Sequence, residues 1–73
     1  NHHGGLKRLL AYIDTPKSGS ECFAPLFKRS IGEAEYGLAL VESVAHLSHL
    51  YQTGLATRDV RDSDGAFVYQ RKE

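Results

Sequence analysis

The sequence predicts a small α+β domain in which helices precede a C-terminal β-hairpin, and two features of its second half support this fold class. First, apolar side chains recur three or four residues apart, the spacing of one helix face; this stripe consists of Leu38, Leu40, Val41, Val44, Ala45, Leu47, Leu50 and Tyr51. Second, two segments of β-forming residues after Gly54 flank the turn-forming stretch Asp62–Gly65. We therefore expect a core-facing helix of about four turns, followed by a hairpin.

The first half predicts one clear helix and two weaker elements. Leu6, Leu9, Leu10 and Ile13 follow amphipathic helix spacing, so a helix is expected from about Leu6 to Asp14. The stretch from Thr15 to Ser20 holds a proline, a glycine and three hydroxyl residues, and predicts an exposed loop. For Glu21 to Phe27 we expect a brief strand or a bend, because Pro25 lacks a backbone donor.

Two arrangements fit the middle of the chain. Ser30 and Glu33 have the spacing of a capping box, which predicts a short second helix from Ile31 to about Tyr36. Gly37 would then form a turn into the long helix. The alternative is one continuous helix from Ile31 to Thr53, because an interior glycine costs a helix only about 1 kcal/mol.

The end of the long helix and the hairpin have local signals. Gly54 suits the left-handed position just after a helix, which glycine adopts without a Cβ clash. The β-forming residues predict antiparallel strands from Leu55 to Arg61 and from Ala66 to Arg71.

A resemblance rests on two runs, residues 44–55 (VAHLSHLYQTGL) and residues 64–69 (DGAFVY). They resemble the recognition helix and β-wing of winged-helix DNA-binding domains, and are most similar to small bacterial repressors of the ArsR and MarR type. The resemblance implies a winged helix-turn-helix over residues 6–73, with three helices and a two-stranded wing. It also implies a transcriptional regulator that binds double-stranded DNA as a homodimer.

The resemblance implies that the long helix enters the major groove while the wing follows the backbone. Polar side chains that could read base edges face away from the apolar stripe. The cations that would meet phosphates lie outside that helix, before the second helix and on the wing. The resulting DNA-contact set is Lys28, Arg29, Ser43, His46, His49, Arg58, Arg61 and Arg71. The simpler interpretation of the wing arginines is a solvated hairpin with weak surface ion pairs.

A second hypothesis keeps the same fold without DNA binding. The long helix has no Arg or Lys, and Glu42 would repel phosphate. The chain also carries 9 basic and 9 acidic residues, so its net charge is zero, which argues against indiscriminate nucleic-acid coating. The alternative is therefore a winged-helix module for protein interaction or dimerisation, in which the polar helix face or the wing docks a partner or neighbouring domain.

Metal and catalytic chemistry receive little support. His46 and His49 could supply two ligands from one helix face, but a site needs three or four, so we predict no metal and no cofactor. The single Cys22 more often indicates a small buried side chain than a nucleophile. We predict no catalytic residues and no enzyme.

The remaining expectations concern the chain ends and the compartment. The sequence has no methionine and begins Asn-His-His-Gly-Gly, so residues 1–5 are interpreted as a tag or linker remnant. One cysteine cannot form an internal disulfide, which favours the cytoplasm. No apolar run reaches the length of a membrane span, so no membrane partner is expected.

Overall fold

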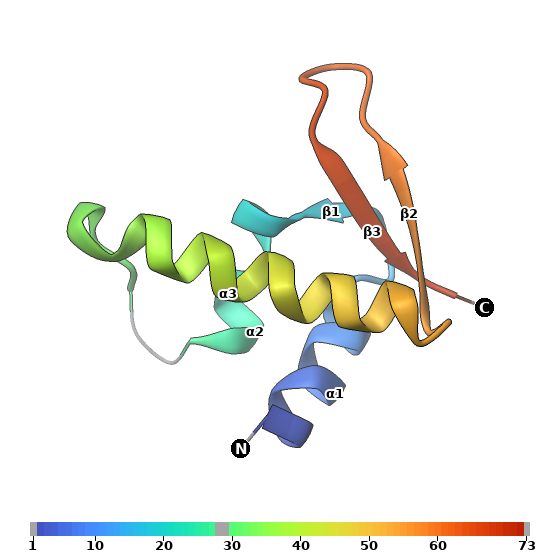
Figure 1. Cartoon of the computed structure of the whole chain (residues 1–73), viewed down its shortest axis with the longest axis horizontal. Coiled ribbons are helices and arrows are strands. Elements are labelled where there is room, and N and C mark those ends of the chain that lie inside the picture. The colour runs from blue at the N-terminus through green and yellow to red at the C-terminus, as the bar shows by residue number, and fades with distance from the viewer. Residues whose placement is uncertain (1, 28–29, 73) are drawn as a thin grey trace.

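The computed structural model describes residues 2–27 and 30–72. Within them the chain forms three α-helices, one 3-10 turn (η1) and a three-stranded sheet (Figure 1). The elements follow in the order α1 (His2–Tyr12), β1 (Lys17–Ser18), η1 (Gly19–Glu21), α2 (Phe23–Leu26), α3 (Glu33–Gln52), β2 (Ala56–Val60) and β3 (Phe67–Arg71). The predicted α+β class is confirmed. No described helix has the length and apolar character needed to cross a bilayer.

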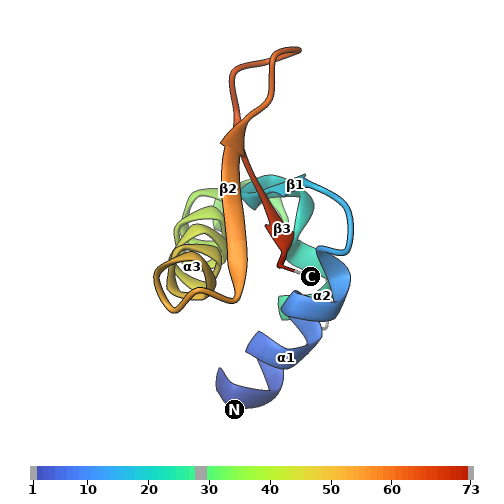
Figure 2. The same ribbon diagram turned by 90° about the vertical axis from the view of Figure 1, so that its right-hand side faces the viewer.

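The sheet is antiparallel with strand order β1-β3-β2. In the centre of the hairpin Arg58 pairs with Tyr69, and Lys17 of β1 pairs with Tyr69 from the other side. The loop end of the hairpin projects beyond the helices (Figures 1 and 2). The hairpin lies where it was predicted, to within a residue at the strand ends, but the predicted loop from Thr15 to Ser20 contains β1 and the start of η1.

The helix-turn-helix prediction is wrong, because α3 runs unbroken through Gly37. The alternative of one continuous helix is confirmed, with bounds slightly inside those expected. The helix begins after Gly32, and no side-chain hydrogen bond caps it, so the predicted capping box at Ser30 and Glu33 does not form. A single interior glycine costs about 1 kcal/mol, and packing along a 20-residue helix offsets that cost.

The end of α3 forms as its sequence predicts. Gly54 adopts a φ of +82°. Its N–H donates to the carbonyl of Tyr51 at 3.2 Å, and the N–H of Leu55 donates to the carbonyl of Leu50 at 3.0 Å. These two bonds are the Schellman pattern, which satisfies carbonyls that the helix leaves without intrahelical partners.

Only part of the apolar stripe of α3 lies in the core. Leu47 and Leu50 are fully buried, but Leu38 and Val41 are 70% and 66% exposed, so the prediction that the stripe faces the core throughout is wrong. The N-terminal half of α3 buries small side chains instead, namely Ala39 and Ser43.

Small side chains are needed there because η1 crosses α3 closely. A Cβ added at Gly19 would lie 2.7 Å from Cγ2 of Val44, closer than real Cβ contacts allow. Gly19 is therefore required by the close approach of η1 to α3, and Ser43 beneath it leaves room for the crossing.

The first half of the chain departs from expectation in α1 and α2. Residues 23–26 form a helical turn rather than a strand or bend. Pro25 is tolerated because N–H groups in the first turn of a helix have no intrahelical partner. The carbonyl of Pro25 accepts a hydrogen bond from Nε of Arg8 at 3.1 Å, which ties α2 to α1. Helix α1 begins four residues before its predicted start and includes residues 2–5, which had been assigned to a remnant.

The core lies between α1, α3 and the base of the sheet. Its buried members are Leu9, Ile13, Cys22, Leu47, Leu50, Ala56 and Tyr69. Backbone bonds close it at the C-terminal end, because the N–H of Arg71 donates to the carbonyl of Ile13 at 2.7 Å and that of Lys72 to the carbonyl of Leu55 at 3.0 Å.

Candidate functional site

The residues predicted to contact DNA do not form one surface. Ser43 is fully buried, and its hydroxyl donates to the carbonyl of Gly19 at 2.7 Å, so the prediction that it faces outward is wrong. The helical phase was misjudged because the buried side chains of α3 are small in its first half. Lys28 and Arg29 lie outside the described residues.

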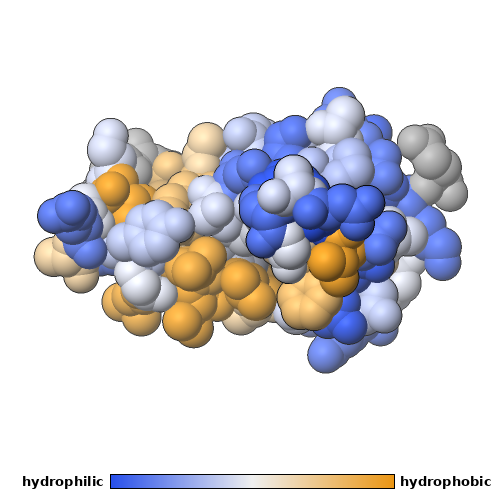
Figure 3. Space-filling view, turned by 90° about the horizontal axis from the view of Figure 1, so that it is seen from above, coloured by the Kyte–Doolittle hydropathy of each residue, from blue (hydrophilic) through white to orange (hydrophobic). Residues whose placement is uncertain are grey.

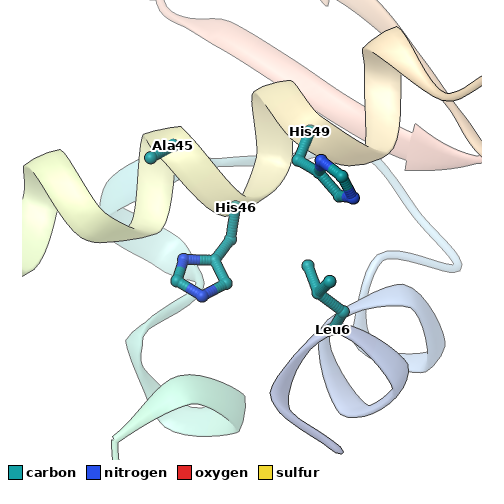
Figure 4. Close-up of a pocket in the computed structure, with 4 residues that line it drawn as sticks. All are labelled: Leu6, Ala45, His46 and His49. Carbon is teal, nitrogen blue, oxygen red and sulfur yellow. The ribbon is translucent and has the colours of Figure 1, made fainter. Parts of the chain in front are cut away.

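The two histidines of the set face α1. His46 and His49 line a shallow cavity of about 270 Å³ together with Leu6 and Ala45 (Figure 4). Nδ1 of His46 lies 2.6 Å from the backbone carbonyl oxygen of Glu42, within the same helix. The described arginines of the set, Arg58, Arg61 and Arg71, lie on the hairpin, so they do not share a face with the histidines.

Arg61 joins the hairpin loop to η1. Its guanidinium contacts a carboxylate oxygen of Asp64 at 2.7 Å and one of Glu21 at 3.1 Å. The Arg61 hydrogen bond and then the N–H of Ala66 lower the pKa of Asp64 to about 2. The pKa of Glu21 is lowered first by the N–H of Ser18 and then by Arg61. Arg61 therefore has a structural role in holding the loop.

Arg71 lies at the end of β3 and is half-buried. Arg58, in contrast, is exposed on β2, and its guanidinium carbon lies 4.4 Å from the ring centre of Tyr51 and 5.0 Å from that of Phe67. These are cation–π distances. Arg58 thus contacts one aromatic ring on α3 and another on the hairpin.

Around Arg58 lies an exposed apolar surface, which we call the α3–hairpin face. It is made of Val41, Val44, Tyr51, Arg58, Val60 and Phe67. Val60 pairs with Phe67 across the hairpin, and Phe67 lines the same groove as Val44. Figure 3 shows hydrophobic residues gathered along the lower side of the view. Sequence reasoning missed this face because it assigned its α3 members to the core.

A signal for the face was present in the width of the stripe. Nine apolar residues between Leu38 and Tyr51, Ala39 included, cover more of the helix circumference than the single core-facing band of a surface helix. In this domain part of that apolar surface stays exposed, at Leu38 and Val41.

The described residues do not form a metal centre. Within residues 2–27 and 30–72 no three His, Cys, Asp or Glu side chains come together in a way that could hold a metal ion. Cys22 is fully buried, and burial, followed by the nearby charge of Glu21, raises the pKa of its thiol to about 11. The thiol is therefore protonated at neutral pH and is a poor nucleophile.

With this geometry in view, comparison with known proteins identifies the family. The model of the family described as metallo-beta-lactamase-like, C-terminal domain, matches residues 6–72. The chain belongs to this family. Among solved structures it is similar to a beta-lactamase domain protein from Burkholderia ambifaria, with a TM-score of 0.88 and 27% sequence identity. No curated protein matches the chain.

The structural match covers 97% of this metallo-β-lactamase-like chain but 21% of the Burkholderia protein. The chain thus spans about a fifth of that relative's length. These findings overturn the assignment to winged-helix repressors, and with it the predictions of a DNA-binding transcriptional regulator and of a winged-helix interaction module. The resemblance misled because a helix with a glycine stop followed by a β-hairpin is a local pattern that unrelated families can share.

Proposed function

We propose that this chain is the C-terminal part of a metal-dependent hydrolase of the metallo-β-lactamase-like class, and that it contributes structure rather than catalytic groups. The observation that carries the proposal is the family match over residues 6–72, which accounts for nearly the whole chain. The solved relative supports it, since a similar domain occupies 21% of a longer beta-lactamase domain protein.

The metal that the family name implies does not fit the described residues. A catalytic zinc ion usually takes three protein ligands and keeps one position for water or substrate. His46 and His49 are the best pair available, but no third donor joins them in residues 2–27 and 30–72, and Nδ1 of His46 is directed at the Glu42 carbonyl. Under this proposal the metal ligands lie elsewhere in the hydrolase.

The test uses the full-length protein that carries this chain. We expect purified protein to contain zinc by elemental analysis and to hydrolyse at least one of three probes: a chromogenic β-lactam, a thioester or a phosphodiester. A variant with His46→Ala and His49→Ala should keep the same zinc content and the same rate, because these side chains lie outside the catalytic centre.

Two results would contradict the proposal. Full-length protein that binds no zinc and hydrolyses none of the probes would exclude the hydrolase class. Loss of zinc in the double histidine variant, with the fold unchanged by circular dichroism, would place the metal site on α3 and overturn the structural role.

A further inference from the structure

The α3–hairpin face exposes more large apolar side chains than an isolated domain needs. Val41 is 66% exposed, Phe67 55% and Val60 50%, while Tyr51 and Val44 are near 40%. Exposed apolar residues scattered singly are ordinary, but a contiguous group marks an interaction site. Here the contacts between α3 and the hairpin join these side chains into one surface.

Three residues of the face, Tyr51, Arg58 and Phe67, are of types that dominate binding energy. Arginine and tyrosine are enriched among interface hot spots, and aromatic residues are enriched in interfaces generally. Arg58 lies against both Tyr51 and Phe67. Among residues 2–27 and 30–72 the structure gives its guanidinium no hydrogen bond or carboxylate. Its N–H groups are therefore available to an acceptor on a partner.

The face also has a shape that can receive a side chain. A groove of about 320 Å³ lies between α3 and the hairpin, where its apolar lining includes Leu40, Val44 and Phe67. The Arg61–Asp64 pair borders the groove, which fixes the hairpin wall. A groove of this kind fits one or two apolar side chains of a docked surface.

We propose that the α3–hairpin face is the surface on which the rest of the same polypeptide, the metallo-β-lactamase domain, docks. This inference rests on the proposed function. In the Burkholderia relative the matched region is 21% of the chain, so about four fifths of that protein lie outside it. The docked surface is apolar and presents a carboxylate or carbonyl oxygen to Arg58.

A second copy of the chain fits the face less well. A two-fold dimer brings the same patch of both copies together, so Arg58 would meet a surface that itself carries Arg58. None of the six residues that define the face is acidic, and Asp64 at the border of the groove is already paired with Arg61. A neighbouring domain that presents a hydrogen-bond acceptor to Arg58 avoids this repulsion. Like-charge contacts therefore disfavour a second copy as the occupant.

Thiol accessibility in the full-length protein tests the proposal. Val41→Cys and Phe67→Cys place thiols on the face, whereas Ala11→Cys and Thr57→Cys place them at exposed positions away from it. Thr57 precedes Arg58 on β2 and so points to the opposite side of the sheet. For each variant, the rate of reaction with a maleimide is measured in native protein and in urea. The rate of the unsubstituted protein under the same condition is subtracted from each, and the native rate is then divided by the rate in urea.

We expect this ratio of native rate to urea rate to be at least tenfold lower for the two face thiols than for the two control thiols. Cys22 adds little background because it is buried. Face thiols that react as fast as the controls would overturn the proposal. The oligomeric state is measured by light scattering in the same samples. If protection of the face thiols disappears on dilution as a dimer dissociates, the occupant is a second copy of the chain, which would also overturn the proposal.

Zinc content and hydrolysis, measured on the same preparations, separate the two proposals. Zinc and activity together with unprotected face thiols would refute the docking surface alone. Protected face thiols without zinc or activity would refute the hydrolase, and with it the identity of the docked domain.

Discussion

Replacing Gly37 by alanine tests the continuous helix α3 directly. Gly37 lies inside the helix, and an added Cβ would meet nothing within 4 Å. Alanine is favoured over glycine in a helix interior by about 0.8–1.0 kcal/mol. The variant should therefore be more stable than the original chain by about 1 kcal/mol, which for a domain of this size raises Tm by roughly 4–8 °C.

Gly54 provides a matched control, because the same substitution there should have the opposite sign. Its Cβ would also be in open space, but its φ is +82°. Left-handed backbone costs a residue with a Cβ about 1–2 kcal/mol. Gly54→Ala should therefore destabilise the chain, leaving the two variants about 2 kcal/mol apart.

Urea unfolding followed by circular dichroism measures both changes. For a small domain the dependence of unfolding free energy on urea is near 1 kcal/mol per molar, so the two midpoints should differ by about 2 M. Destabilisation by Gly37→Ala as large as that by Gly54→Ala would mean that the chain turns at residue 37, and would refute the continuous helix.

Three further predictions concern buried and charged groups. Ser43→Ala should destabilise the chain by about 0.5–1.5 kcal/mol more than Ser48→Ala, because only Ser43 donates a buried hydrogen bond; equal midpoints in urea would contradict this. Cys22 should react with iodoacetamide at pH 8 at least tenfold more slowly in folded than in unfolded chain, since its pKa is raised to about 11; comparable rates would show that the thiol is accessible. The pKa of Asp64 is lowered to about 2, so the stability from its contact with Arg61 is present above about pH 4 and declines as the pH falls toward 2. Asp64→Asn should therefore lose less stability than the original chain over this pH range, measured by acid unfolding. An acid unfolding profile that the substitution leaves unchanged would contradict this prediction.

The parts of the fold that were predictable depend on local chemistry. Gly54 ends a helix because of its own backbone freedom, and Gly65, with a φ of +73°, turns the hairpin for the same reason. Both signals operate within a few residues of the chain. The strands on either side of Gly65 were therefore located correctly without knowledge of any distant contact.

The parts that were not predictable depend on distant contacts. Strand β1 is two residues long and is defined by its pairing with β3, which no local pattern indicates. Helix α2 spans four residues around Pro25, too few for a periodic signal. Ser43 appeared polar and outward, but the crossing of η1 near Gly19 buries it.

The candidate site shows the same division between local pattern and distant context. Val41 and Leu47 belong to one apolar stripe, yet Val41 is exposed and Leu47 is fully buried in the chain's own core. Hydrophobic periodicity indicates that a side chain favours burial, because its transfer from water is favourable whatever surface covers it. It does not identify the covering surface. In a domain that matches part of a longer relative, an apolar position on a helix is therefore as consistent with a domain interface as with the core, and exposure in the folded chain distinguishes the two. By that criterion Leu47 belongs to the core of this domain, and Val41 belongs to the face that we propose as its docking surface.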